Sequence, residues 1–596
     1  MESKCQETLI GKLRREFKPR IPKELESLSS MKFSTGDKTT ALGNAKEIEN
    51  LFPLTYGQPI IDMSQTSSSS SSSSEYKESE NKVNTQPLRV GVVLSGGQAS
   101  GGHNVITGLF DALKELNKDS ILIGFTGGPK GIMINRYIEL KSDTIDLYRN
   151  TGGFDMIQAG RDKIQSVEQM QASLKTVEDN KLNGLVIIGG DDSNTNAAIL
   201  AEFFQKNGSK CTVVGIPKTI DGDLQNEYIE VSFGFDTAVK TYSEMISNIC
   251  RDAVSAAKTW HFVKLMGRDA SQVTLDCAIQ TQPNIALIGE EIQQESMLLH
   301  DVTSKMVDII EDRALNGMNY GVALIPEGVI QFIPSMKVLI NYLNTTLKEG
   351  SKHLEAVEKL DEMSEKIQYV RTLLRDSSPT NLSNFDVLPK DIQAQLLLER
   401  DPHGNIQMSQ VPIENLFIQI CQQKLKQRKK YVESGTKFRG QGHFFGYDGR
   451  SCYPSNFDAQ YCYSLGRVGT LLIAGNYNGY MARVYNLEYD VTEWKIGAIP
   501  ITMLLNIEIR HGKPKPVIKK ALVNVESGPK FGYFVKRRDD WAYDTMYRYL
   551  GPIQFFGPTD LTDIPPFNVL LKKTNDIKWP LQQKKKKSDD DDKQKK

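Results

Sequence analysis

Short apolar segments alternate with longer amphipathic segments through the first half of the chain. The apolar segments are rich in Val and Ile, which favours buried strands, and the segments between them carry apolar residues at helical spacing. The predicted strands are 89–94, 120–125, 185–188 and 212–216, and the predicted helices are 104–116, 167–180 and 193–204. This alternation predicts βαβ units and a mostly parallel sheet.

A second set of such segments predicts a second α/β unit. Strands are expected at 261–265, 285–288 and 321–325, and helices at 238–257 and 270–280. From Tyr342 to Tyr431 the pattern changes, because Glu, Lys, Leu and Gln dominate at helical spacing and predict a helical insertion. The α/β pattern returns at 444–447 and 458–473.

These patterns divide the chain into six expected parts. An N-terminal extension contains the run Ser67 to Ser74, which buries too little apolar surface to become ordered, although Ile48 to Tyr56 is apolar enough to dock on the body. The Lys and Asp blocks of the tail are expected to stay disordered. The parts are the extension (1–86), a first α/β domain (87–235 with 445–500), a second α/β domain (236–341 with 432–444), the helical insertion (342–431), a C-terminal extension (501–583) and the tail (584–596).

Composition narrows the class of protein. Lys and Arg number 73 and Asp and Glu also number 73, so no overall field favours nucleic acid or an anionic membrane. The seven cysteines lack C-x-x-C spacing, which indicates reduced thiols in a cytosolic protein. No signal peptide and no apolar stretch of bilayer length are apparent, so we expect a cytoplasmic protein without a membrane span.

The most informative motif is Gly189-Gly190-Asp191-Asp192-Ser193, between a predicted strand and a predicted helix. Loops at the carboxyl ends of strands bind ligands in open α/β sheets, and helix N-termini favour anions. Adjacent carboxylates at such a position need a cation to offset their repulsion. The alternative is that Asp191 or Asp192 simply caps the helix.

Two further motifs follow predicted strands. The segment from Ser95 to His103 contains four glycines, whose backbone N–H groups suit phosphate, although a tight turn without a ligand explains them equally well. Pro217-Lys218-Thr219-Ile220-Asp221-Gly222-Asp223 combines a lysine that offsets phosphate charge with a carboxylate that accepts a proton from a hydroxyl nucleophile. The alternative is a solvated, charged loop.

Arginines occupy two more glycine-containing turns. Arg268 ends Leu265-Met266-Gly267-Arg268, and Arg450 ends Gly446-Tyr447-Asp448-Gly449-Arg450. Arginine binds phosphate in a bidentate manner, but each could also be an ordinary surface residue. Arg161 is a further candidate cation. His103 could contact phosphate, although a polar residue in the first turn of a helix is the favoured interpretation.

Taken in this order, the motifs closely resemble the phosphofructokinase family, in particular the long-chain catalytic form of its pyrophosphate-dependent branch. The resemblance covers roughly residues 88–501. It implies two Rossmann-like three-layer α/β units with a helical insertion. It also implies reversible transfer of a phosphoryl group from pyrophosphate to the 1-hydroxyl of fructose 6-phosphate, with Mg²⁺ as cofactor. The first α/β domain would bind diphosphate and Mg²⁺, and the second would bind the sugar phosphate.

The resemblance implies a role for each matching residue. Asp221 would be the general base, Asp191 the Mg²⁺ ligand, and Asp192 and Lys218 the residues that select the donor. The remaining residues would bind the substrates: Gly97, Arg161, Thr219, Ile220, Asp223, Lys258, Met266, Gly267, Arg268, Glu327, Tyr447 and Arg450. Lys258 stands without the tyrosine that follows it in many relatives, where the pair reaches a neighbouring subunit, so it implies a homodimer or higher homo-oligomer.

Two other functions compete with transfer from pyrophosphate: those of an ATP-dependent phosphofructokinase and of a regulatory subunit. ATP-using relatives carry glycine in place of Asp192 and Lys218. Two like charges about 4 Å apart at an effective dielectric of about 20 repel by roughly 4 kcal/mol, about a thousandfold against ATP, unless Mg²⁺ or Lys218 screens them. An ATP-dependent phosphofructokinase is therefore disfavoured. A non-catalytic regulatory subunit of the pyrophosphate enzyme is also disfavoured, because we would expect Asp191, Asp221 or Arg268 to be replaced in it.

Overall fold

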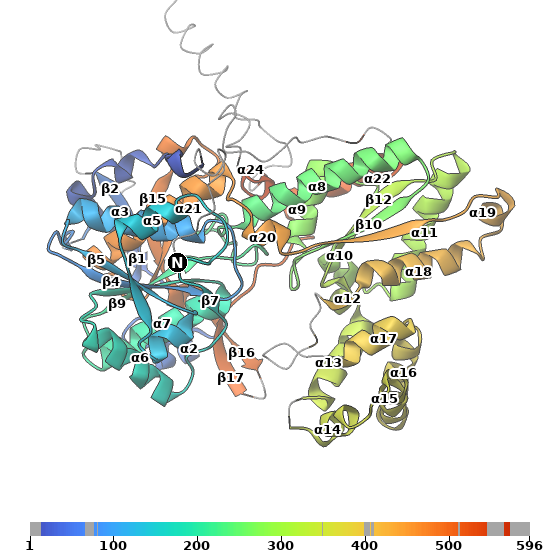
Figure 1. Ribbon diagram of the computed structural model, residues 1–596, viewed down its shortest axis with the longest axis horizontal. Helices are drawn as coiled ribbons and strands as arrows, with labels where there is room; N and C mark the ends of the chain where they lie inside the picture. Colours follow the sequence, from blue (N-terminus) through green and yellow to red (C-terminus); the bar gives the residue numbers. More distant parts are fainter. Residues whose placement is uncertain are drawn as a thin grey trace, which may run out of the picture.

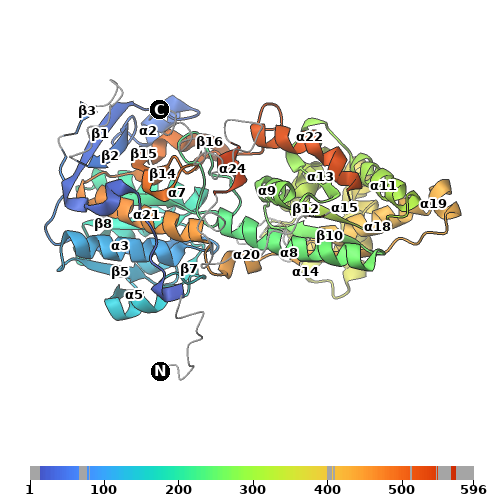
Figure 2. The ribbon, with the colours of Figure 1, turned by 90° about the horizontal axis from the view of Figure 1, so that it is seen from above.

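The computed structural model describes residues 14–65, 77–79, 81–348, 350–398, 406, 410–510, 513–544, 547 and 565–571. The predicted disordered run Ser67 to Ser74 and the tail 584–596 lie outside these ranges. Two α/β bodies lie side by side, and both views show helix α8 (Phe235–Ala256) reaching from their junction into the second body (Figures 1 and 2).

The first body is built on an 11-stranded sheet in the order β3-β1-β2-β15-β14-β9-β8-β4-β5-β6, with β7 paired to β4. Its central strands β14, β9, β8, β4 and β5 are parallel, and antiparallel strands flank them on both sides. The strands are β1 (Met31–Lys38), β2 (Pro59–Gln65), β3 (Lys77–Glu78), β4 (Arg89–Ser95), β5 (Ile121–Phe125), β6 (Tyr137–Leu140), β7 (Ala159–Gly160), β8 (Gly184–Gly189), β9 (Thr212–Pro217), β14 (Tyr480–Tyr485) and β15 (Lys495–Pro500).

Helices cover both faces of this sheet, which explains why its central strands are continuous apolar runs. Helices α3 (Gly102–Leu116) and α21 (Asn456–Ala474) pack on one face, and α6 (Val167–Asp179) and α7 (Asp191–Lys206) pack on the other (Figure 1). The result is a three-layer unit.

The second body contains a four-stranded parallel sheet in the order β11-β12-β10-β13. Its strands are β10 (Trp260–Leu265), β11 (Ile285–Ala286), β12 (Gly321–Pro326) and β13 (Gly440–Phe445). Helices α8 and α9 (Gln272–Thr281) share one apolar cluster with β10, and α11 (Leu299–Leu315) and α18 (Ile413–Leu425) share another. The prediction of two three-layer α/β units is confirmed.

The described part of the predicted insertion is helical. Helix α13 (Pro334–Thr346) leads into it. Val370, Leu374 and Phe385 of the insertion join the apolar cluster that α11 and α18 form on the second sheet. The helices are α14 (Lys352–Glu358), α15 (Met363–Ser377), α16 (Pro379–Asp386), α17 (Lys390–Leu397), α18 and α19 (Lys429–Glu433). The exact boundaries proposed for the individual domains stay predictions.

Both terminal segments contain ordered elements that pack on the rest of the chain. Strands β1 and β2 continue the sheet beyond β15, and Ile48 and Phe52, in and just after helix α2 (Ala45–Leu51), are buried against α7. Beyond β15 the chain forms the hairpin β16 (Leu505–Arg510) and β17 (Lys513–Ile518), and then helix α22 (Pro529–Tyr543). The region predicted as a C-terminal extension therefore contains ordered elements that pack on both bodies.

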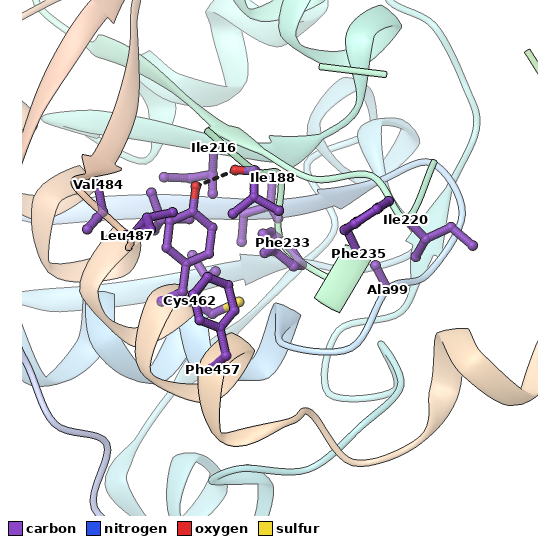
Figure 3. Packing of buried hydrophobic residues seen from close by; sticks show 14 of the residues in the cluster. Ala99, Ile188, Ile216, Ile220, Phe233, Phe235, Phe457, Cys462, Val484 and Leu487 are labelled. Atoms are coloured by element: carbon purple, nitrogen blue, oxygen red, sulfur yellow. Dashed lines mark hydrogen bonds between the residues drawn. The ribbon is translucent and has the colours of Figure 1, made fainter. Parts of the chain in front are cut away.

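One apolar cluster supports two loops that carry candidate chemistry. Ala99 of the glycine turn and Ile220 of the loop after β9 meet Phe235 at the start of α8, and Phe233 lies deeper in the same cluster (Figure 3). A Cβ on Gly234 would lie 2.6 Å from Cβ of Ala99, so this close approach requires glycine. The two loops are thereby fixed relative to each other.

Candidate active site

The strand order places a ligand site at the carboxyl ends of β4 and β8. The chain proceeds from β4 to β5 on one side and from β8 to β9 on the other, and ligands bind where the order of an open α/β sheet reverses in this way. The loops that follow β10, β12 and β13 in the second body reach the same space. We call the loops after β4, β8 and β9 the phosphate wall, and those after β10, β12 and β13 the sugar wall.

A cavity of about 550 Å³ lies between the two walls. It brings together fourteen of the sixteen residues predicted from the sequence. These are Gly97, Arg161, Asp191, Asp192, Lys218, Thr219, Ile220, Asp221, Asp223, Met266, Arg268, Glu327, Tyr447 and Arg450. Motifs that are dispersed along the sequence therefore share one site, while the role of each residue stays a prediction.

Asp191 and Asp192 lie in the first turn of α7, and Gly190 occupies the capping position. The interpretation of either aspartate as the helix cap is therefore wrong. The Asn194 side chain holds the turn by donating hydrogen bonds to the carbonyl oxygens of Gly189 (2.6 Å) and Gly190 (3.0 Å). Asp192 forms an ion pair of 2.8 Å with Lys163, a residue that the sequence did not single out.

Basic side chains gather around the glycine turn after β4. Lys218 Nζ donates a hydrogen bond to the Gly97 carbonyl (2.8 Å), and Arg450 Nε donates to the Gln98 carbonyl (2.8 Å). A Cβ on Gly97 would lie 2.2 Å from the Arg450 guanidinium, so glycine permits this approach. Burial, with a contribution from the Arg450 charge, lowers the pKa of Lys218 to about 8.

The loop after β9 presents two carboxylates at different depths. The Asp221 backbone N–H donates to Thr219 Oγ1 (3.0 Å), and Gly222 adopts a φ of +72° in the turn that follows. Asp221 is partly exposed, whereas Asp223 is buried. Burial, reinforced by the charges of Asp221 and Asp191, raises the pKa of Asp223 to about 7.

The sugar wall combines a buried carboxylate with exposed groups. Glu327 accepts a backbone hydrogen bond from Gly267, and its Oε2 atom has no hydrogen-bond partner among the described residues. Burial and the nearby Asp221 charge raise the pKa of Glu327 to about 7. The side chain of Arg268 is 41% exposed and Tyr447 is 54% exposed, so both can reach a ligand in the cavity.

Two predicted residues lie outside the cavity lining. Gly267, with a φ of +123°, shapes the turn that carries Met266 and Arg268. Lys258 is exposed and precedes β10, at the opposite end of that strand from Met266. His103 is buried behind the glycine turn, where it bonds Thr151 Oγ1 (2.8 Å) and the Met156 N–H (3.3 Å), so its place is structural.

Four charged residues of the cavity were missed by sequence reasoning: Asp162, Lys163, Asp269 and Lys520. The first three adjoin predicted motifs, and their positions next to or near Arg161 and Arg268 were the available signal. Lys520 gives no such signal, because it follows β17 and reaches the cavity from a part of the chain that carries no recognised motif.

The structure also bears on the expected absence of a membrane span and on the expected reduced thiols. Within the described ranges, no helix combines the length and the apolar composition needed to cross a bilayer. The six cysteines in the described part of the chain carry free thiols, and five of them are buried.

Comparisons with known proteins agree with the motifs. The model of the phosphofructokinase family matches residues 89–371. The pyrophosphate–fructose 6-phosphate 1-phosphotransferase of Treponema pallidum (strain Nichols) is 46% identical over 95% of this chain and 97% of its own length. The subunit beta 2 of the enzyme of the same name from Arabidopsis thaliana is 48% identical over 88% of each chain.

Among solved structures, the pyrophosphate-dependent phosphofructokinase from Nitrosospira multiformis has a TM-score of 0.48 at 14% identity, over 70% of this chain and 83% of that chain. The assignment rests on the relatives in sequence, which match nearly the whole chain at identities far above this value. The chain belongs to the phosphofructokinase family, in its branch of pyrophosphate–fructose 6-phosphate 1-phosphotransferases.

Proposed function

We propose that this protein transfers a phosphoryl group from pyrophosphate to the 1-hydroxyl of D-fructose 6-phosphate, giving fructose 1,6-bisphosphate and phosphate. The hydroxyl oxygen forms a bond to phosphorus while the bond from phosphorus to the bridging oxygen breaks. The electron pair of that bond leaves with the phosphate, and the proton of the hydroxyl passes to Asp221. Each direction breaks one P–O bond and forms one, so the same site can catalyse the reverse transfer.

The observation that carries this proposal is the meeting of both walls at Asp221. Its carboxylate lines the cavity between the phosphate wall, with Asp191 and Gly97, and the sugar wall, with Arg268 and Glu327. A base at that junction can accept a proton from a sugar hydroxyl that faces a bound diphosphate. There is little covalent work for the protein in such a transfer, so alignment and charge neutralisation account for most of the catalysis.

The sugar wall supplies the contacts proposed for fructose 6-phosphate. Arg268, Tyr447 and Arg450 would hold the 6-phosphate and the ring, since arginine matches the geometry of phosphate oxygens. The unpaired Oε2 atom of Glu327 would accept a hydrogen bond from a sugar hydroxyl. Met266 and Gly267 would shape the floor on which the ring lies.

Asp192 and Lys218 would select pyrophosphate over ATP. Asp192 stands in space that the α-phosphate of ATP would need, and Lys218 supplies a cation beside the glycine turn. The ion pair with Lys163 screens the Asp192 charge, so repulsion of ATP is weaker than the bare Coulomb figure of roughly 4 kcal/mol. Steric exclusion then accounts for a larger share of the preference.

The carboxylates of the phosphate wall fit a magnesium ion. Asp191 and Asp223 both approach one cation, because Lys520 Nζ lies 3.7 Å from Asp191 Oδ2 and 3.9 Å from Asp223 Oδ2. Mg²⁺ prefers one or two carboxylates together with substrate phosphates and water. We propose Asp191 as its main protein ligand; when bound, the ion neutralises charge on the diphosphate. Thr219 and Ile220 would line the substrate pocket beside Asp221, and Arg161 would lie near the transferred phosphoryl group and the metal.

Assembly and location are also proposed. We infer a homodimer or larger homo-oligomer, because Lys258 matches a residue that reaches a neighbouring subunit in the family. The Arabidopsis relative is named as a subunit, which supports an assembly. A cytoplasmic location stays a prediction.

Parallel assays test the proposal. The purified chain is given fructose 6-phosphate and Mg²⁺ with either pyrophosphate or ATP, and fructose 1,6-bisphosphate is measured. We expect product with pyrophosphate alone. Product with ATP alone would contradict the roles of Asp192 and Lys218. No product with either donor would favour the alternative of a regulatory subunit that needs a catalytic partner.

A further inference from the structure

The end of β17 and the segment that follows it reach the cavity at Lys520 and are held at three points. The backbone N–H of Ile518 donates to Thr195 Oγ1 (3.3 Å), that of Ala521 to the Asp223 carbonyl (2.7 Å), and that of Val523 to Glu290 Oε1 (2.9 Å). These bonds tie the segment to α7 on one side and to α10 (Gly289–Gln294) on the other. The backbone position of Lys520 is therefore set independently of its side chain.

The Lys520 ammonium lies among three carboxylates. It donates a hydrogen bond to Asp269, while Asp191 (3.7 Å) and Asp223 (3.9 Å) lie beyond the usual hydrogen-bond length of about 2.7–3.2 Å. An ammonium has three N–H donors. Asp269 is its one hydrogen-bond partner among the described residues, so donors remain for an anion that enters the cavity.

The charge of the surrounding groups shows why an anion would need this cation. Asp191, Asp221 and Asp223 would repel a diphosphate that approached them without compensation. Lys163 pairs with Asp192 and Lys218 bonds the Gly97 carbonyl, whereas Lys520 has its ammonium within 4 Å of both Asp191 and Asp223. Lys520 is 27% exposed and lines the cavity, so a ligand can reach it.

We propose that Lys520 is a catalytic residue whose ammonium, positioned by Asp269, binds the phosphoryl group during its transfer between pyrophosphate and the sugar. The proposal rests on the reaction proposed above. Lys520 forms and breaks no covalent bond and keeps its protons. A fixed cation at the place where charge spreads over the equatorial phosphoryl oxygens stabilises the transition state without reorganisation.

A purely structural role is the competing explanation. In that case Lys520 would only join the C-terminal segment to the two bodies, and its loss would lower stability and both substrate affinities together. The three hydrogen bonds that the backbone N–H groups of Ile518, Ala521 and Val523 donate already provide this connection. The two roles therefore predict different results for the same substitution.

The test compares Lys520→Met with Lys519→Met in the full chain. Lys519 is the matched control, because it carries the same side chain one residue earlier, is exposed and lies outside the cavity lining. For each variant we would measure turnover with pyrophosphate, the melting temperature, and calorimetric affinities for fructose 6-phosphate and for methylenediphosphonate with Mg²⁺. Methylenediphosphonate resembles pyrophosphate but cannot transfer its phosphoryl group.

For Lys520→Met we expect turnover to fall by about a hundredfold and methylenediphosphonate to bind about tenfold more weakly. The affinity for fructose 6-phosphate and the melting temperature should stay close to those of wild type, as should every property of Lys519→Met. Turnover within about threefold of wild type would overturn the proposal. A parallel loss of stability and of both affinities would also overturn it, in favour of the structural role.

A second variant keeps the test decisive if Lys520→Met does not fold. Lys520→Arg retains the charge that faces the carboxylates, but its planar head places the donors differently. We expect it to fold and to bind methylenediphosphonate while turnover falls at least about tenfold; wild-type turnover would overturn the proposal. If the wild-type chain binds methylenediphosphonate but shows no turnover with pyrophosphate, the reaction proposed above is wrong for this chain. The calorimetric comparison of wild type with the variants then still decides whether Lys520 binds the diphosphate.

Discussion

The two walls of the cavity differ in how their charged groups are paired before a ligand enters. On the phosphate wall, Asp192 pairs with Lys163 and Asp191 faces Lys520. On the sugar wall, Oε2 of Glu327 is buried without a hydrogen-bond partner among the described residues, and Tyr447 is exposed. The carboxylates of the phosphate wall thus face cations that are already in place, while the sugar wall, besides the ion pair of Arg268 with Asp269, leaves an acceptor ready for a donor.

The difference follows from the chemistry of the two ligands. A diphosphate brings several negative charges and accepts hydrogen bonds, so its wall needs cations that are already in place. A sugar brings hydroxyl donors of its own, so an unpaired carboxylate oxygen becomes satisfied when the sugar binds. Without a bound sugar, the pKa of Glu327 is raised to about 7, because burial destabilises its charged form.

The largest expected effect lies where the walls meet. We expect Asp221→Asn to reduce turnover by on the order of a thousandfold, because the amide cannot accept the proton of the sugar hydroxyl. Binding on both walls should change little, since the substitution keeps the size and the hydrogen bond between the Asp221 N–H and Thr219. Rapid-quench measurement of a single turnover, together with calorimetry of each ligand, would separate the two effects.

Asp162→Asn serves as the control for Asp221→Asn, because Asp162 also lines the cavity but is exposed and lies apart from the loop after β9. Its turnover should stay within a fewfold of wild type. If Asp221→Asn kept near-normal turnover, or if both substitutions cost the same, Asp221 would not be the base.

The contrast between the walls also explains what could be predicted from sequence. The phosphate wall follows three neighbouring parallel strands, and because the carboxyl ends of parallel strands lie at one edge of a sheet, the strand–helix alternation predicts that the loops carrying Gly97, Asp191 and Asp221 share an edge. Glu327 and Arg450 were placed by family resemblance, because the sheet of the second body is assembled from strands far apart in the chain. The α/β architecture could be predicted because its central strands, such as β8 and β12, are buried on both faces and lack polar interruptions.

Lys520 shows where such prediction fails. A lysine in a segment without a strand-to-helix transition looks like a surface residue, and only the folded chain brings it to Asp191 and Asp269. The pairing of Lys163 with Asp192 was missed for a related reason, since sequence spacing does not reveal which carboxylate a neighbouring loop faces. Ion pairs between loops depend on tertiary packing, which the local pattern does not encode.

The second prediction removes the donor selectivity of the phosphate wall. We expect Asp192→Gly combined with Lys218→Gly to lower kcat/KM for pyrophosphate by about a hundredfold and to admit measurable use of ATP. Lys218 then no longer bonds the Gly97 carbonyl, and the space taken by Asp192 becomes free. Kinetics with both donors at fixed fructose 6-phosphate would measure the change.

Lys163→Met separates charge from shape in this selectivity. It leaves the Asp192 carboxylate in place without the screening ion pair. If repulsion contributes, binding of both pyrophosphate and ATP should weaken by roughly fivefold.

For the variant that combines Asp192→Gly with Lys218→Gly, an unchanged preference for pyrophosphate over ATP would show that Asp192 and Lys218 do not select the donor.

The third prediction concerns the pH dependence of the sugar wall. The pKa of Glu327 is raised to about 7, so its carboxyl is increasingly protonated below that pH. An ionised Oε2 accepts a hydrogen bond from a sugar hydroxyl better than the protonated form does. KM for fructose 6-phosphate should therefore rise by about tenfold when the pH falls from 8 to 6.

The sugar phosphate titrates near pH 6 as well, so Glu327→Gln is the necessary reference. The variant keeps the phosphate contribution and loses that of the carboxyl, and its KM should vary less steeply with pH than that of wild type. Identical pH profiles for the two proteins would exclude Glu327 as the group that responds to pH.

The smallest expected effect tests whether the sugar wall is complete within one chain. Lys258 is exposed at the end of β10 away from the cavity, so any contact it makes with substrate must be with the site of another subunit. We expect Lys258→Ala to raise KM for fructose 6-phosphate by no more than about fivefold, because exposed ion pairs contribute about 1 kcal/mol or less. Light scattering of wild type and variant at the assay concentration would report their molar masses. A rise in KM with an unchanged dimer mass would mean that the sugar wall is shared between chains. A monomeric wild type would mean that one chain supplies the sugar wall alone. An unchanged KM in an intact oligomer would mean the same.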